Sequence, residues 1–182
     1  LMAGLGLGGA EILFVNRMQV DPPDSGLANH CIVLNNVLHP QLYARLKQTG
    51  MAASLFNKLP GDGNPAYLAR LLDYLKRQGI RLVHTHDEGA LHWALAAKAL
   101  RPGLKVVHTV HNTGLAPAWN PLRKALYGRL LDYAVAISDA VAQECHAAGL
   151  RKVRAIYNGI PVAAFGVPAR VHRVPSAGAP LR

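Results

Sequence analysis

The sequence predicts an α/β domain with a doubly wound, mostly parallel sheet, and three observations lead to this fold class. Short apolar stretches rich in β-branched residues alternate with helical patterns about every 25 residues, as in sheets built with right-handed crossover helices. A glycine-rich segment, residues 4–9, separates the first apolar stretch from the first helical pattern. Polar residues follow the strand candidates at their carboxyl ends, where such sheets bind ligands.

The first half of the chain is predicted to hold three strands and three helices. Residues 1–3 look like the last part of a strand whose beginning is missing, which is a first hint of truncation. The clearest helix begins at Pro65, because Asn64 is a favourable N-cap, proline suits the first helical position and Gly79 suits the end. The expected elements are strand 1–3, helix 10–18, strand 31–34, helix 40–47, strand 51–56 and helix 65–78.

The second half continues the alternation with four strands and three helices. Asn120 and Pro121 repeat the cap and proline signal, and Ser138 is the expected N-cap of the next helix. The pattern is lost after Phe165, so residues 161–182 are expected to form a crossover linker or a disordered tail behind a domain of residues 1–160. The expected elements are strand 80–85, helix 88–100, strand 104–110, helix 121–131, strand 133–137, helix 138–148 and strand 152–157.

The composition indicates a globular protein with anionic partners. Hydrophobic residues make up 51% of the chain, and 20 Lys and Arg against 10 Asp and Glu give a net charge of +10. The basic residues lack the aromatic interleaving of a single-strand binder, so no nucleic acid partner is expected. Two cysteines form neither a disulfide framework nor a metal pair, which fits a reducing, cytoplasmic location, and no apolar run reaches membrane-spanning length.

The glycine-rich segment predicts an anion site at the start of the first helix. Four of its six residues are glycine, which suits a sharp turn, a positive φ or the close approach of a ligand. The free amides and the dipole of the helix favour phosphate there. A nicotinamide or flavin site is disfavoured, because the next strand ends in Asn35 and Asn36 rather than in an acidic residue. A P-loop is excluded, because Ala10 stands where lysine is required. A tight turn without a ligand is the alternative.

Polar residues follow four further strands at the same predicted edge. They are His86 and Asp87, His111 and Asn112, Ser138 and Asp139, and Asn158 and Gly159. In a Rossmann-like sheet with the usual strand order 3-2-1-4-5-6, the glycine-rich segment and His86 flank the point where the order reverses. We therefore expect the ligand to bind between them.

These features together resemble the amino-terminal domain of family 4 glycosyltransferases of the GT-B fold. After the glycine-rich segment come H-T-H-D at 84–87, H-T-V-H-N at 108–112, A-I-S-D-A at 136–140 and I-Y-N-G-I at 156–160, and the resemblance covers residues 1–166. It implies one Rossmann-like half of a two-domain enzyme whose donor-binding second domain is absent from this chain. It also implies a retaining hexosyltransferase of polysaccharide biosynthesis that uses a nucleotide-diphosphate sugar, a saccharide or lipid-linked acceptor, no metal and no other cofactor.

The resemblance assigns roles to individual residues. His111 matches the histidine that contacts the donor sugar near the site of transfer, so it is the expected catalytic residue. Gly8 and Gly9 would lie under the donor diphosphate, with their amides facing negative charge. The residues expected on the acceptor side are Glu11, His86, Asp87 and Asn112, and Asn158 with Gly159 match the start of the crossover into the second domain. The family's donor-binding glutamate pair belongs to that second domain, so the isolated chain is expected to be inactive.

Two other functions are compatible with these residues. A zinc-dependent hydrolase would draw its ligands from His84, His86, Asp87, His92, His108 and His111. Zinc needs three or four converging ligands with second-shell partners, and we favour the simpler interpretation that His84 and His108 are hydrogen-bonded core residues. The other alternative is a non-catalytic module, or a truncated remnant, that binds a saccharide or a partner. A carboxyl-terminal extension with the glutamate pair would distinguish the enzyme from the module.

The helix predicted over residues 121–131 combines an apolar and a basic pattern. Leu122, Leu126 and Leu130 share one side, with Arg123, Lys124 and Arg129 around it. Such a helix suits a peripheral contact with the acidic inner face of a membrane. We favour the alternative, an ordinary packed helix with a solvated basic face.

Overall fold

The computed structural model describes residues 1–20 and 28–159 and confirms the predicted α/β class. Every pairing between its strands is parallel. The predicted tail at 161–182 lies outside the described residues. The elements are α1 (Gly9–Val20), β1 (His30–Asn35), α2 (Pro40–Gln48), β2 (Ala52–Lys58), α3 (Pro65–Arg77), β3 (Leu82–Thr85), α4 (Glu88–Leu100), β4 (Lys105–Val110), α5 (Leu115–Ala118), α6 (Pro121–Leu130), β5 (Tyr133–Ala136), α7 (Asp139–Ala147) and β6 (Val153–Ala155).

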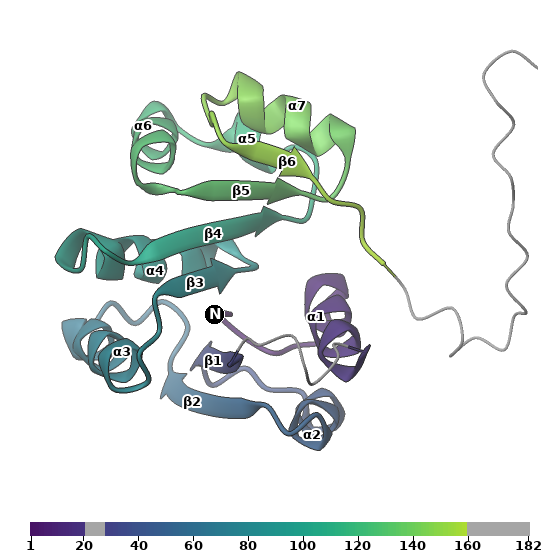
Figure 1. The fold of residues 1–182 in the computed structure, drawn as a ribbon, viewed down its shortest axis with the longest axis vertical. Coiled ribbons are helices and arrows are strands. Elements are labelled where there is room, and N and C mark those ends of the chain that lie inside the picture. Colours follow the sequence, from purple (N-terminus) through teal and green to yellow (C-terminus); the bar gives the residue numbers. More distant parts are fainter. Residues whose placement is uncertain (21–27, 160–182) are drawn as a thin grey trace, which may run out of the picture.

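The first residues of the chain join two groups of strands. β1 pairs with β2, and β3, β4, β5 and β6 form a second, four-stranded sheet. Between the groups, the amide of Met2 donates to the carbonyl of Ile32 at 2.9 Å, and the nitrogen of Leu1 donates to the carbonyl of His84 at 2.7 Å. The spatial order is therefore β2, β1, residues 1–3, β3, β4, β5 and β6, with the N-terminus between β1 and β3 (Figure 1). This is the expected order, although the predicted first strand is reduced to an isolated bridge.

The predicted helix starts are confirmed by side-chain caps. Asn64 accepts a hydrogen bond from the amide of Ala66 at 2.9 Å, and Asn120 accepts one from the amide of Arg123 at 2.8 Å. Gly79, just beyond α3, has a φ of +63°, as expected for a glycine that ends a helix. These ends were predictable because each depends on a few neighbouring residues.

The sequence predicted no helix between the strand at 104–110 and the helix at 121–131, and this is wrong in part. Residues 115–118 form the one-turn helix α5, which begins after Gly114 in the left-handed region at φ +80°. The amide of Gly114 donates to Glu144 of α7 at 2.8 Å, and Ala116 and Trp119 are buried. One turn of helix carries no readable period, so its position depends on these tertiary contacts.

Two hydrophobic clusters hold the domain together. The larger surrounds β3 to β6 and includes Leu71, Leu91 and Tyr127. The smaller lies around β1, α1 and α2 and includes Met2 and Leu5, which are 1% and 0% exposed. The start of the chain is thus anchored by apolar side chains, and this anchor fixes the position of the glycine-rich segment. No helix among the described residues is both long enough and apolar enough to cross a membrane.

Candidate functional site

The glycine-rich segment lies against the loop between β1 and α2. The amide of Leu5 donates to the carbonyl of Val37 at 2.8 Å, and the amide of His39 donates to the carbonyl of Leu5 at 2.7 Å. A Cβ on Gly4 would lie 3.1 Å from the Cβ of Val37, so the first glycine allows this close approach of two backbones. The segment is therefore held in place before the helix starts.

The later glycines of the segment leave space rather than provide unusual dihedral angles. The glycines with positive φ all lie elsewhere in the described residues, at positions 50, 61, 79, 114 and 149. A Cβ placed on Gly6 or Gly9 would meet no atom within 4 Å. Of the three reasons for glycine that the sequence offered, a positive φ is therefore excluded at Gly6 and Gly9, and the space beside both residues is open.

An acidic side chain lies over the start of α1. A Cβ on Gly8 would overlap the carboxylate of Glu11, which belongs to the first turn of the helix. A carboxylate is favourable at this end of a helix, because the free amides and the helix dipole are positive there. Glu11 therefore marks the position as one that accepts negative charge.

Two histidines from neighbouring strands meet beside α1. His86 follows β3, His111 follows β4, and Nδ1 of His86 lies 3.3 Å from Nε2 of His111. The ring of Phe14 in α1 lies 5.6 Å from that of His86, and the ring of His84 lies 4.4 Å from it. The sheet order brings these groups together, because parallel strands end at one edge.

Burial keeps these histidines neutral. It lowers the pKa of His86 to about 2 and that of His84 to about 4. It also lowers the pKa of His111, although the charge of Asp87 acts in the opposite direction. In a neutral pair one imidazole donates and the other accepts, so the contact between His86 and His111 uses one nitrogen of each ring.

His84 and His108 are hydrogen-bonded within the sheet, as predicted. Nε2 of His84 lies 2.7 Å from Oγ1 of Thr109, and Nδ1 of His108 lies 2.9 Å from Oγ1 of Thr85. His108 is 2% exposed, and burial lowers its pKa to about 3. Over residues 1–20 and 28–159, no group of three or more His, Cys, Asp or Glu side chains is placed to hold a metal ion. That part of the chain therefore offers no set of ligands for the zinc ion of a hydrolase.

Asp87 is engaged with the backbone. Its Oδ1 accepts a hydrogen bond from the amide of Ala90 at 2.7 Å, which caps α4, and its Oδ2 accepts one from the amide of Ala3 at 2.8 Å. Gly89 is close to the same segment, since a Cβ there would lie 3.1 Å from the Cβ of Ala3. Asp87 thus ties the start of the chain to α4. The N-cap role was readable from aspartate before a helical pattern, whereas the contact with Ala3 spans 84 positions and was not.

The remaining residues that the sequence predicted for the site lie outside the contact between His86, His111 and Phe14. Asn112 is exposed next to His111, and Asn158 and Gly159 are exposed beyond β6. The structure adds Phe14, which sequence analysis assigned no role although it packs on His86. An apolar residue within a helix gives no sequence signal for such a contact.

Comparisons with known proteins identify relatives of this domain. The sequence model of Glycosyltransferase Family 4 matches residues 49–164, which include the four later motifs but not the glycine-rich segment. Two crystal structures of Anabaena Alr3699/HepE, one in complex with UDP and one with UDP and glucose, superpose with a TM-score of 0.67 at 17% identity. They cover 90% of this chain, whereas this chain spans 44% and 45% of theirs. A third structure, with UDP-glucose, has the same TM-score at 16% identity. No curated protein sequence matches the chain.

Proposed function

Because this chain belongs to glycosyltransferase family 4, we propose that it is the acceptor-side domain of a retaining glycosyltransferase. The enzyme transfers a hexose from a nucleotide-diphosphate sugar to a saccharide or lipid-linked acceptor in the cytoplasm, without a metal or other cofactor. The observation that carries this proposal is the contact of α1, through Phe14, with the pair His86 and His111 where β3 and β4 end. A nucleotide-sugar donor is supported by the HepE structures, which contain UDP or UDP-glucose.

The donor diphosphate binds at the start of α1 in this proposal. The open space beside Gly6 and Gly9 admits a phosphate close to the backbone, and the free amides of the first turn donate to its oxygens. The same amides stabilise the charge that develops when the nucleotide diphosphate departs. In the structure the Glu11 carboxylate lies against Gly8, in the space that the diphosphate would fill. In this proposal the carboxylate therefore moves aside when the diphosphate binds.

His111 contacts the donor sugar near the reacting carbon. Its lowered pKa leaves a neutral ring, which donates or accepts a hydrogen bond without placing a positive charge beside the forming oxocarbenium-like centre. His86 holds this ring at 3.3 Å and is itself held by Phe14. Catalysis of this kind rests on positioning the acceptor hydroxyl beside the reacting carbon.

The acceptor enters on the side of His86. We place Glu11, Asp87 and Asn112 there too, with Asp87 acting through the backbone that it holds. Asn158 and Gly159 lead into the second, donor-binding domain. This arrangement is supported by the HepE comparison, in which the present chain corresponds to less than half of the larger protein.

The test uses the native polypeptide purified from its source cells, because both domains are required. Release of nucleoside diphosphate from UDP-glucose and other nucleotide sugars is measured with and without saccharide acceptors. His111→Ala is expected to lower kcat about a hundredfold. His146→Ala is the matched control, because His146 is an exposed histidine on α7 that bonds the Leu150 carbonyl, and it should leave kcat unchanged.

Three outcomes separate the alternatives. Turnover that depends on His111 supports the transferase. If His111→Ala keeps the same kcat as the control His146→Ala, His111 does not belong to the catalytic site. Saccharide binding without turnover by a folded native protein would favour the non-catalytic module.

A further inference from the structure

A basic groove lies at the opposite edge of the sheet, where the strands begin. It runs between the end of α6 and the turn that joins α7 to β6, and it encloses about 490 Å³. Gly128 approaches Gly149 within it, and a Cβ on Gly128 would lie 3.4 Å from the Gly149 carbonyl oxygen. Lys124, Arg129 and Arg151 line its sides. We use "basic groove" for these five residues.

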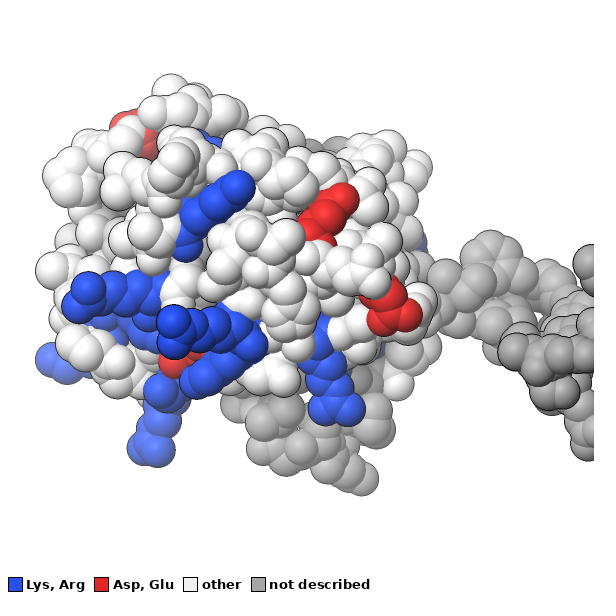
Figure 2. Space-filling model, turned by 90° about the horizontal axis from the view of Figure 1, so that it is seen from above, with Lys and Arg blue, Asp and Glu red and all other residues white. Residues whose placement is uncertain are grey.

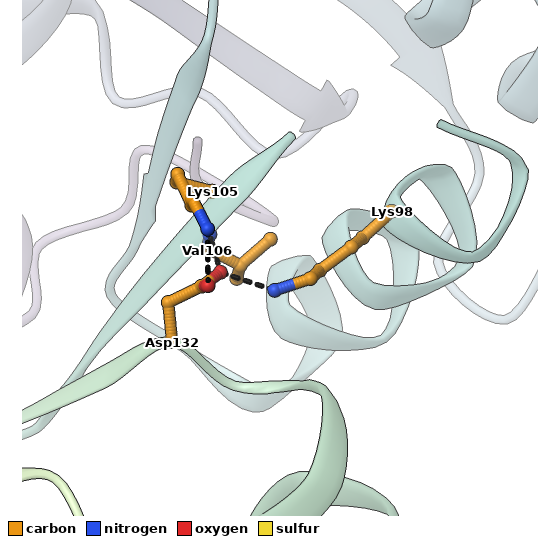
Figure 3. A network of polar contacts seen from close by, with 4 residues as sticks. All are labelled: Lys98, Lys105, Val106 and Asp132. Atoms are coloured by element: carbon orange, nitrogen blue, oxygen red, sulfur yellow. Dashed lines mark hydrogen bonds and ion pairs between the residues drawn. The ribbon is translucent and has the colours of Figure 1, made fainter. Parts of the chain in front are cut away.

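The nearby acid does not neutralise the groove. Asp132 accepts hydrogen bonds from Lys98, from Lys105 at 3.3 Å and from the amide of Val106 at 2.8 Å (Figure 3). Two cations thus already compensate its single charge. Asp132 also lines a cavity of about 180 Å³ next to the groove, together with Arg129, Arg151 and Lys152.

The cations of the groove are therefore available to another molecule. Within the described part of the chain, no salt bridge involves Lys124, Arg129, Arg151 or Lys152. Seen from above, Lys and Arg side chains gather on one side of the molecule while the acidic side chains of that face are few (Figure 2). Such a surface attracts anions.

The orientation of α6 exposes two leucines, and their spacing puts them on the side of the helix that carries Arg129. Its buried residue is Tyr127, which is 0% exposed and whose hydroxyl lies 2.7 Å from Nε2 of His92. Leu122 and Leu126 consequently face outward and are 76% and 41% exposed. The helix is packed through Tyr127 and the half-buried Leu130, as the interpretation favoured from the sequence expects, but Leu122 and Leu126 are left uncovered. Exposed leucines on the same side of a helix as a cation without a salt bridge are one feature of helices that lie on a membrane surface.

We propose that the basic groove, Lys152 and the leucines of α6 bind the surface of an anionic phospholipid bilayer. The cations pair with the lipid phosphates, and the two leucines enter the boundary between headgroups and acyl chains. A soluble polyanion would satisfy the cations but would leave the leucines in water, so the bilayer fits both observations. The helix has 10 residues and lies on the bilayer without crossing it. This surface is built from residues other than those of the transferase site and stands independently of that proposal.

The test is flotation of the purified chain with two kinds of vesicle. One kind is phosphatidylcholine, and the other contains about 30% phosphatidylglycerol, a fraction that gives a negative surface potential. We expect the chain to bind only to the anionic vesicles, and we expect this binding to weaken as salt is added. The triple variant R129Q/R151Q/K152Q should bind about a hundredfold more weakly, because each cation contributes about fivefold. The matched control K47Q/K76Q/R77Q loses the same charge from α2 and α3 and should bind as the unaltered chain does.

A second variant separates the bilayer from a soluble polyanion. L122Q/L126Q keeps every cation, so it should lose vesicle binding severalfold while it retains binding to inorganic polyphosphate. Both residues are exposed, and an unchanged melting temperature will show that the variant folds. Equal binding to neutral vesicles, equal loss in both triple variants, or a leucine variant that floats as before would each overturn the proposal.

Discussion

The two edges of this sheet carry opposite kinds of polar chemistry. Where β3 and β4 end, the titratable groups are half-buried histidines whose lowered pKa values leave them neutral, and Asp87 is bound to backbone amides. Where the strands begin, the groups are exposed cations such as Arg129 and Arg151. Burial thus determines the protonation of the groups where β3 and β4 end. Where the strands begin, the cations are exposed and keep their charge. Substitutions at the first edge should therefore change stability, whereas charge substitutions in the basic groove should change affinity alone.

Acid should destabilise the protein through three histidines, the buried His108 and the half-buried His84 and His86, and this is the largest effect that we expect. His84, His86 and His108 have folded pKa values of about 4, 2 and 3, whereas an unfolded histidine has a pKa near 6.5. Below about pH 6.5 these histidines therefore bind protons in the unfolded chain but stay neutral in the folded chain. The free energy of unfolding consequently falls as the pH falls. At about pH 5 each histidine should cost about 2 kcal/mol, or about 6 kcal/mol together. Urea unfolding at neutral and acidic pH measures this loss.

Two variants sharpen this prediction. His108→Leu removes one proton-binding group, so the dependence of the unfolding free energy on pH should shrink by about a third. R129Q/R151Q/K152Q should keep the full dependence, because its changes lie at the exposed edge. If His108→Leu leaves the slope unchanged, the buried histidines are not the source of the acid sensitivity.

Removing the Asp132 carboxylate, where the strands begin, should have a smaller effect on the free energy of unfolding. The Lys98 side chain is only 13% exposed, so Asp132→Asn leaves a nearly buried cation without its partner. We expect a loss of about 2 kcal/mol in the free energy of unfolding at neutral pH. Asp73→Asn is the control, because Asp73 and Arg77 form a 2.5 Å pair whose side chains are 55% and 67% exposed, and its loss should be close to zero. Similar losses in both variants would show that Asp132 is an ordinary surface acid.

The pH dependence of this contribution has a definite direction. Partial burial alone would raise the pKa of Asp132, but hydrogen bonds from Lys98, Val106 and Lys105 outweigh it and hold the pKa below its ordinary value. The contribution is therefore complete at neutral pH and is lost as the pH falls through the folded value. In Asp132→Asn this part of the acid response should disappear, while the histidine part at higher pH remains.

The sequence predicted those features that depend on local patterns or on sheet order. Helix caps such as Asn64 and Asn120 were local, and the meeting of His86 and His111 followed from strands that end at one edge. The orientation of α6 could not be predicted, because Tyr127 is buried by tertiary contacts with partners outside the helix. Trp119 packs against it at 4.9 Å, and His92 of α4 bonds its hydroxyl. The leucine pattern of α6 is compatible with either face inward, and only these contacts decide between them.

The smallest expected effect separates stability from ligand binding at Gly9. A methyl group fits there, since a Cβ would meet nothing within 4 Å, and the φ of Gly9 is not positive. Because Gly9 is the first residue of α1, Gly9→Ala should stabilise the fold by about 0.5 kcal/mol. The same methyl group would stand where we place the donor diphosphate, so the affinity of the native enzyme for its nucleotide sugar should fall. Thermal unfolding and titration calorimetry measure the two quantities. Gly103→Ala, at an equally open glycine before β4, should leave donor affinity unchanged. If Gly9→Ala binds the donor as the unaltered enzyme does, the phosphate does not approach the backbone at this glycine, and the open space before α1 serves the fold alone.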